Sequence, residues 1–450
     1  MRHVAGLWDN WKVQFLGITV VSLISSFIQA FSVGLAIPLV DDFTYLRIAD
    51  TLFKTGVFTN LGLEATPGAW LAPLYIGLLD LIAFFNGDFA ALLDCMGGSD
   101  PGNCALNAME VLFVVQAVLG GGIYILTFYT IKTISDNKAL AFIAMLLVVA
   151  SNAYGVFFYR ALTETLAFFL LSAAMLFWVR AFSSNAKNVR NILLLGAFIG
   201  MASLTRPSYL YLGIALYAVY AYYRKAIEKD ELAHVAYAVA MSALTFSLTV
   251  LPWMVRNLVQ LDTFAITENY DLTVFGKRAS YNSMSWPEYW VSYVYWLPVI
   301  GEKLASLLFD EALYSRLGFI GSNVYFNDVA LVHDAIHDAG GIGPYIFDNL
   351  FKHLMLTIPI AVRGMWVGGF VSVVGLLCFI PVALMEARNG SLSKLLMFVF
   401  PSVFMVGFHA FASANMVRYN TPLIIVYAYC AAYIAVTFHQ KWLHRSPKSG

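Results

Sequence analysis

The chain has 450 residues, of which 60% are hydrophobic and 12% charged, and its formal net charge at pH 7 is zero. A soluble domain carries about twice that share of charged residues, so the composition excludes an ordinary soluble domain. The neutral charge balance gives no support for nucleic-acid binding.

Long apolar stretches recur along the whole chain. Each has about twenty residues, enough to cross roughly 30 Å of hydrocarbon. The first is too long for the apolar region of a signal peptide, so we expect a retained helix. We predict an all-α, polytopic membrane protein with about ten transmembrane helices. The predicted spans are 13–38, 109–131, 139–158, 164–182, 191–205, 208–223, 234–254, 366–386, 395–413 and 417–438.

Two further apolar stretches, 70–86 and 345–363, are interrupted by polar or proline residues. We interpret them as re-entrant or interfacial helices, because the distribution of basic residues then fits one orientation. If both termini lie on the inner side of the membrane, fifteen of the 27 Lys and Arg residues lie in inner segments, and the short outer turns hold only three. This bias predicts cytoplasmic termini. The lack of long luminal insertions suggests a prokaryotic inner membrane.

The spans predict three parts. Residues 1–254 form an N-terminal transmembrane module with a first outer loop at 39–108, residues 255–365 form an outer interfacial segment, and residues 366–450 form C-terminal helices with a short tail. In the first loop, Cys95 and Cys104 flank a turn rich in Gly, Asp and Pro. A disulfide is expected if this loop faces an oxidising compartment; the alternative is two unpaired loop thiols.

An acidic pair, Asp41 and Asp42, directly follows the first span. Apolar residues recur at helical spacing from Leu46 to Phe53, and Gly56 ends the run, which predicts a short amphipathic helix in the membrane interface. One of the acids could simply cap this helix. Capping does not account for two adjacent carboxylates against the membrane, and a carboxylate there could act as a general base.

Other exceptional charges fall on the same predicted side of the membrane. They are Arg160, Glu164, Arg206, Arg256 and Arg418. Each arginine taken alone could extend to the interface without a function. Their recurrence on one side indicates a site that holds an anion beside a catalytic carboxylate.

A metal site is not expected. His333 and His337 have the i, i+4 spacing of helical zinc ligands, with Asp334 and Asp338 beside them. They lack the glutamate of a His-Glu-x-x-His motif, so we interpret them as structural or solvated histidines.

These residues form a familiar series of motifs. Asp41-Asp42-x-x-Tyr45 resembles the opening of the first outer loop in the C-type (GT-C) glycosyltransferases. The branch in question contains the protein O-mannosyltransferases, lipid A aminoarabinose transferases and lipopolysaccharide sugar transferases. The family motif is usually Asp-Glu-x-x-Tyr, so Asp42 stands where glutamate is commoner. Further resemblances follow in order: Tyr159–Thr165, Leu204-Thr205-Arg206-Pro207, Pro252-Trp253-x-x-Arg256-Asn257 and Arg418-Tyr419-x-x-Pro422.

The resemblance implies a GT-C-like architecture and a polyprenyl-phosphate-linked sugar donor. It implies inverting, metal-independent transfer, with no cofactor, to an acceptor hydroxyl on the outer, periplasmic side. The acceptor would be a glycolipid, a polysaccharide or a protein. Asp41 would be the general base and Asp42 would orient the acceptor or tune Asp41. Candidates to bind the phosphate are Arg206, Arg256 and Arg418, while Tyr45, Arg160 and Glu164 would contact substrate or support the site.

Two other functional classes remain open. One is a flippase or transporter of lipid-linked sugars, and the other is a protein similar to an O-antigen polymerase or ligase. Transporters often show internal repeats and polar groups near the midplane of the membrane. Here the charges gather at one interface and no repeat is visible, which favours an enzyme.

Overall fold

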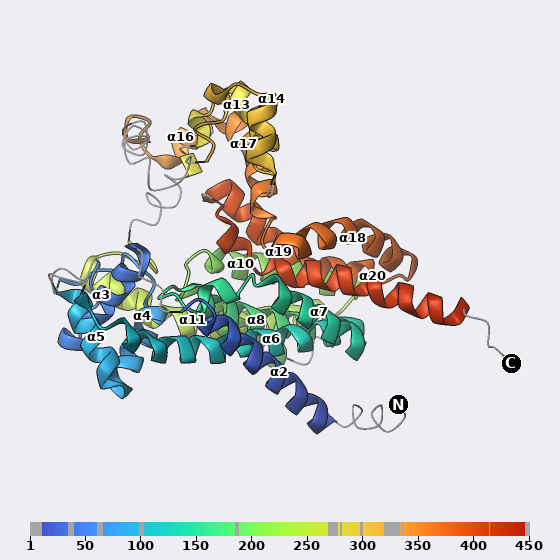
Figure 1. The fold of residues 1–450 in the computed structure, drawn as a ribbon, viewed down its shortest axis with the longest axis horizontal. Helices are drawn as coiled ribbons and strands as arrows, with labels where there is room; N and C mark the ends of the chain where they lie inside the picture. Colours follow the sequence, from blue (N-terminus) through green and yellow to red (C-terminus); the bar gives the residue numbers. More distant parts are fainter. Residues whose placement is uncertain are drawn as a thin grey trace. The chain divides into compact units, whose positions relative to one another are not determined.

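The computed structural model describes residues 11–34, 40–60, 66–98, 103–184, 189–268, 278–279, 281–297, 300–318, 334, 336–413 and 415–445. Every regular element within these residues is a helix (Figure 1). Residue contacts divide the chain into two compact units. Unit 1 comprises residues 1–268, 374–398 and 425–450, and unit 2 comprises 269–373 and 399–424. The division into two units rests on residue contacts, whereas the three predicted parts rest on membrane topology. The two divisions therefore cannot be compared directly, and the three parts stay a prediction.

Unit 1 contains all the N-terminal helices. They are α2 (Trp11–Phe31), α3 (Val40–Thr55), α4 (Pro73–Phe85), α5 (Gly87–Gly97), α6 (Glu110–Ser135), α7 (Lys138–Ser151), α8 (Glu164–Ser183), α9 (Arg190–Ser203), α10 (Tyr209–Tyr222) and α11 (Leu232–Leu261). Three long helices near the C-terminus pass through both units: α18 (Gly369–Arg388), α19 (Leu392–Ala412) and α20 (Leu423–Arg445).

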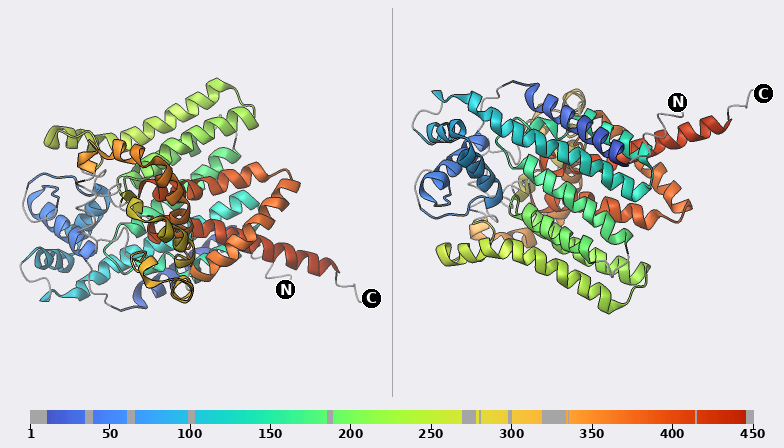
Figure 2. Two further views of the ribbon diagram at one scale, coloured as in Figure 1. Left: turned by 90° about the horizontal axis from the view of Figure 1, so that it is seen from above. Right: turned by 90° about the horizontal axis from the view of Figure 1, so that it is seen from below.

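Five helices of unit 1 pack in series, in the order α2, α6, α8, α9 and α11 (Figure 2). The middle helix, α8, is buried along most of its length, whereas α2 and α11 leave many large apolar side chains exposed. Exposed apolar faces of this kind suit contact with lipid. Close packing depends on small residues: a Cβ atom on Gly196 of α9 would lie 2.3 Å from the carbonyl oxygen of Ser242 in α11.

The helices of the predicted first outer loop, α3, α4 and α5, pack against one another. The predicted amphipathic helix is α3, and Gly56, with φ of +69°, ends it in the left-handed region that favours glycine. The stretch predicted at 70–86 forms α4, whose 13 residues are too short to cross the membrane alone.

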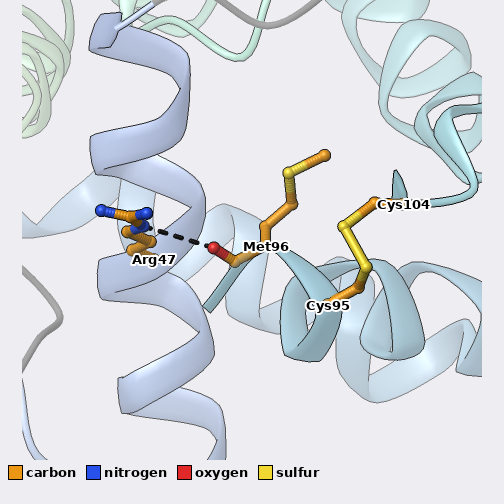
Figure 3. The surroundings of a disulfide bond; sticks show 4 residues. All are labelled: Arg47, Cys95, Met96 and Cys104. Atoms are coloured by element: carbon orange, nitrogen blue, oxygen red, sulfur yellow. Dashed lines mark hydrogen bonds between the residues drawn. A yellow bond between two sulfur atoms is a disulfide. The ribbon is translucent and has the colours of Figure 1, made fainter. Parts of the chain in front are cut away.

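A disulfide joins Cys95, near the end of α5, to Cys104, so the structure has the first of the two arrangements considered for these thiols (Figure 3). Next to it, the main-chain oxygen of Met96 accepts a hydrogen bond of 3.3 Å from Arg47 Nε in α3 (Figure 3). The disulfide therefore closes the loop that contains Met96, and Met96 is the residue that Arg47 of α3 contacts.

Unit 2 contains α13 (Trp286–Tyr295), α14 (Gly301–Leu308), α16 (Ile342–Asp348) and α17 (Leu350–Gly364). A capping box formed by Ser285 and Glu288 starts α13. Arg278 is fully buried and donates hydrogen bonds of 2.7 Å to the main-chain oxygens of Ala410 and His353. The helices of unit 2 therefore pack around a buried guanidinium.

Seven helices of the described residues are long and apolar enough to span a membrane: α2, η2 (Leu106–Met109) continued by α6, α8, α11, α18, α19 and α20. Shorter apolar helices include α7 and α9. Four predicted spans differ clearly in extent from the helices. The helix predicted at 13–38 ends at Phe31, and the helix predicted at 234–254 continues to Leu261. The helix predicted at 139–158 ends at Ser151, because Asn152 adopts a left-handed conformation, with φ of 51°. The span predicted from 417 starts at Leu423, because residues 417–420 form the 3-10 helix η9.

Candidate active site

The first element of the site is an ion pair between Asp42, in the first turn of α3, and Arg160. Arg160 Nε donates to both carboxylate oxygens, at 3.3 and 3.0 Å, and Nη2 donates to Oδ2 at 2.6 Å. The Asp42 side chain is 1% exposed and that of Arg160 is 20% exposed. A paired, bidentate contact of this kind fixes both orientation and charge.

The turn that carries Arg160 lies between α7 and α8 and is held by hydrogen bonds to main-chain oxygens. The Gln116 side chain, fully buried on α6, donates to the main-chain oxygen of Arg160 at 2.7 Å. Thr165 Oγ1 donates to the main-chain oxygen of Phe157 at 3.2 Å. The packing of α6 and α8 therefore positions the arginine.

A second ion pair lies at the start of α8. Arg206 Nη2 donates to Glu164 Oε1 at 3.1 Å, and the Glu164 side chain is 2% exposed. Arg206 follows the end of α9, where its main-chain N–H donates to the Ala202 oxygen at 2.8 Å. The two ion pairs thus join three segments of unit 1: the start of α3, the turn into α8 and the residues after α9.

Tyr45, one turn after Asp41 on α3, connects the acidic pair with the second ion pair. Burial raises its pKa, and the negative charge of Glu164 raises it further, while Arg206 and a hydrogen bond with Thr163 oppose the change. Asp41 acts on the same hydroxyl and is half-buried. Asp41, Asp42, Tyr45, Arg160, Glu164 and Arg206 are therefore brought together in unit 1.

Arg256, near the end of α11, contacts the segment between α3 and α4. Its guanidinium donates to the main-chain oxygens of Gly68 at 2.8 Å and Phe58 at 3.1 Å, and lies 4.8 Å from the centre of the Trp253 ring. Asn257 donates to the oxygen of Ala265 at 2.8 Å. Within the described residues, the Pro-Trp-x-x-Arg-Asn motif thus anchors loop main chain.

Arg418 belongs to unit 2, in η9, where its guanidinium lies 5.5 Å from the ring centre of Tyr419. The same segment holds a polar network, in which His409 hydrogen-bonds Asn420 at 3.1 Å and Asn415 donates to the Ile360 oxygen at 2.6 Å. The role of Arg418 in phosphate binding stays a prediction.

Two residues around the ion pairs were not singled out by the sequence analysis. They are Tyr75, whose ring packs edge-on against Tyr45, and Gln116. Gln116 and Tyr75 are single polar residues within apolar stretches, a signal that could have indicated them. Within the described residues, no group of three or more His, Cys, Asp or Glu side chains is placed to hold a metal ion; His333 lies outside these residues.

Residues 110–266 match the family model described as dolichyl-phosphate-mannose-protein mannosyltransferase. This match confirms the predicted resemblance to the GT-C superfamily over that segment. The segment contains Arg160, Glu164, Arg206 and Arg256. No curated protein matches the sequence.

Two solved structures share the fold. One is ArnT from Cupriavidus metallidurans bound to undecaprenyl phosphate, with a TM-score of 0.50 and 13% identity over 94% of this chain and 59% of that one. The other is the apo oligosaccharyltransferase of Archaeoglobus fulgidus, with a TM-score of 0.55 and 12% identity over 98% of this chain and 52% of that one. At these identities the likeness concerns the fold alone, and the chain spans between half and three fifths of their lengths.

Proposed function

We propose that this chain is a membrane glycosyltransferase, because residues 110–266 match the family model described as dolichyl-phosphate-mannose-protein mannosyltransferase. It takes a sugar from a polyprenyl-phosphate-linked donor and transfers it to an acceptor hydroxyl on the outer side of the membrane. The acceptor is a glycolipid, a polysaccharide or a protein. The fold shared with an enzyme that binds undecaprenyl phosphate supports this choice of donor.

The observation that carries the proposal is the assembly of two ion pairs, Asp42–Arg160 and Glu164–Arg206, around Asp41 and Tyr45. A donor with its tail in lipid places its phosphate and sugar at the headgroup level. Transfer there needs a base for the acceptor and positive charge for the leaving phosphate. The charged residues of unit 1 supply both.

Asp41 is the proposed general base. It accepts the proton of the acceptor hydroxyl as that oxygen bonds to the anomeric carbon, and the bond from this carbon to the phosphate oxygen breaks. The polyprenyl phosphate leaves with the electron pair, so a single displacement inverts the configuration. Asp42 is held by Arg160, so we assign it to orienting Asp41 and the acceptor.

Arg206 is the proposed phosphate-binding residue of unit 1. Its side chain is 16% exposed beside Glu164, and a guanidinium can bind a phosphate through two hydrogen bonds. Arg256 instead holds main-chain oxygens of the first outer loop. Arg418 stays a second candidate. Because arginine supplies the positive charge, the proposed reaction uses no metal ion.

The proposed topology has ten spans: the seven long apolar helices together with α7, α9 and α10. Both termini lie in the cytoplasm of a prokaryotic cell, and α3, α4, α5 and residues 255–365 lie on the outer side of its inner membrane. This arrangement places Asp41 and Arg206 on one side. The excess of basic residues in the inner segments supports it.

The proposal is tested with the purified full-length protein in liposomes. Polyprenyl phosphates carrying different radiolabelled sugars are supplied with candidate acceptors, and both label transfer and release of polyprenyl phosphate are measured. A transferase couples the two with inverted stereochemistry. Movement of the intact labelled lipid across the bilayer, without release, would show a flippase and contradict the proposal.

A further inference from the structure

Tyr75 of α4 is a fully buried residue whose hydroxyl has no hydrogen-bond partner among the residues that the structure describes. Burying a hydroxyl without a partner is unfavourable, and such groups in folded proteins are uncommon. The position of this hydroxyl beside the two ion pairs makes it a candidate contact for a bound substrate.

The start of α4 and the ring of Tyr75 are each held by a contact with another segment. Pro73 starts α4, and the main-chain N–H of Leu74 donates to the oxygen of Leu204 at 2.9 Å, which ties α4 to the segment leading to Arg206. The ring of Tyr75 meets that of Tyr45 edge-on, with ring centres 5.5 Å apart and planes at 89°. The hydroxyl is therefore held in place at the proposed active site.

The neighbours of this hydroxyl decide which chemical group it would bind. Burial raises the pKa of Tyr75 well above its usual value, and the charges of Asp42, Tyr45 and Glu164 raise it further, so the group stays neutral and can donate. The carboxylates beside it, Asp42 and Glu164, are already paired with Arg160 and Arg206, and a neutral hydroxyl adds no positive charge of its own to select a phosphate. A sugar hydroxyl is neutral, and it both accepts and donates hydrogen bonds.

We propose that Tyr75 forms part of a subsite for the transferred sugar, in which its hydroxyl hydrogen-bonds a sugar hydroxyl and makes the enzyme selective for sugars that carry that group. The inference rests on the proposed function, because it places the sugar beside Asp42 and Glu164. It adds a residue that belongs to none of the sequence motifs, and it separates the sugar-binding part of the site from the arginine that binds phosphate.

The matched variants are Tyr75→Phe and Tyr427→Phe. Tyr427 of α20 is also buried and its hydroxyl also lacks a partner among the described residues. Both substitutions remove one oxygen and leave the ring, so a purely structural role for Tyr75 predicts the same behaviour for the two proteins.

The experiment measures two quantities with full-length protein: the affinity for a polyprenyl-phosphate sugar relative to the bare polyprenyl phosphate, and kcat/KM for that sugar relative to its analogues lacking one hydroxyl. For Tyr75→Phe we expect the sugar-dependent affinity to fall about 10- to 100-fold, with selectivity against one deoxy analogue lost. Affinity for the bare lipid should not change, and Tyr427→Phe should match wild type in every measurement.

The outcomes separate this inference from the proposed function. If transfer occurs and Tyr75→Phe keeps the wild-type selectivity, the sugar subsite is wrong while the transferase proposal stands. If no transfer occurs but Tyr75→Phe alone removes sugar-dependent binding, the subsite stands and the transferase proposal falls. A wild-type protein that binds the sugar-bearing lipid no better than the bare lipid would overturn the subsite.

Discussion

Arg160 binds the buried carboxylate of Asp42 through Nε and Nη2, while Asp41, the preceding residue in the chain, is half-buried. Two adjacent acids thus have different surroundings. The carboxylate held by a guanidinium is suited to orientation. Asp41 is the carboxylate that we assign to accept the proton of the acceptor hydroxyl.

Removal of either partner of the Asp42–Arg160 pair should destabilise the protein. Asp42→Asn or Arg160→Gln removes this ion pair in a largely buried position, and we expect a loss of about 3 kcal/mol in the free energy of unfolding. The double variant should recover part of this loss but remain inactive. Thermal unfolding in detergent measures it. Equal stability in all four proteins would show that the pair has no structural role.

Arg256→Lys should affect the first outer loop and leave phosphate binding intact. A lysine cannot reproduce the contacts of the guanidinium with Phe58 and Gly68, so we expect faster proteolysis of residues 57–72 and a loss of about 1–3 kcal/mol in stability. Affinity for undecaprenyl phosphate, measured by titration, should stay unchanged. The comparison is Arg206→Lys, for which this affinity should fall. If Arg256→Lys lowers this affinity and Arg206→Lys does not, the phosphate lies at Arg256.

Loss of the disulfide should loosen the end of α5. Closing a loop of this length stabilises a protein by about 2–3 kcal/mol, so Cys95→Ser/Cys104→Ser, or added reductant, should lower the unfolding temperature. Cys378→Ser, which changes a thiol outside any disulfide, is the control. An unfolding temperature that does not respond to reductant would contradict the pairing.

Unit 2 should lose stability in mild acid because of His353. Burial, and then the charge of Arg278, lower the pKa of His353 from 6.5 to about 4. The folded state therefore binds fewer protons than the unfolded state, so this stability is complete above pH 6.5 and falls as the pH decreases towards 4. The loss approaches about 3 kcal/mol at the lower end.

Hydrogen exchange in α17 at pH 7 and pH 4.5 tests this pH dependence. In the wild type, protection from exchange should be lower at pH 4.5 than at pH 7. His353→Gln should show less protection than the wild type at pH 7, and its protection should differ less between the two pH values. A variant with the same pH dependence as the wild type would assign the effect to another group.

The sequence alone predicts the helices well where hydrophobic length is decisive. The amphipathic helix after Asp42 and its end at Gly56 also follow from local spacing, and α3 confirms both. The end of α7 at Asn152 could not be predicted, because the apolar stretch continues past it and only the backbone conformation stops the helix.

The site was predicted less completely. Motif order indicated Asp42, Arg160, Glu164 and Arg206, but not that Arg160 would bind Asp42 and Arg206 would bind Glu164, because such pairing depends on how α3, α8 and α9 pack. Tyr75 was missed for the same reason: its importance arises from packing against Tyr45, and no local motif marks it.

The most direct test of the account is the rate of sugar transfer by Asp41→Asn, with Asp88→Asn, an exposed acid on α5, as the control. The substitution keeps the size of the side chain and removes the proton acceptor, so kcat should fall by about 10²- to 10⁴-fold. Donor affinity and unfolding temperature should match those of the wild type, and Asp88→Asn should transfer sugar normally. Full transfer activity in Asp41→Asn would contradict the account.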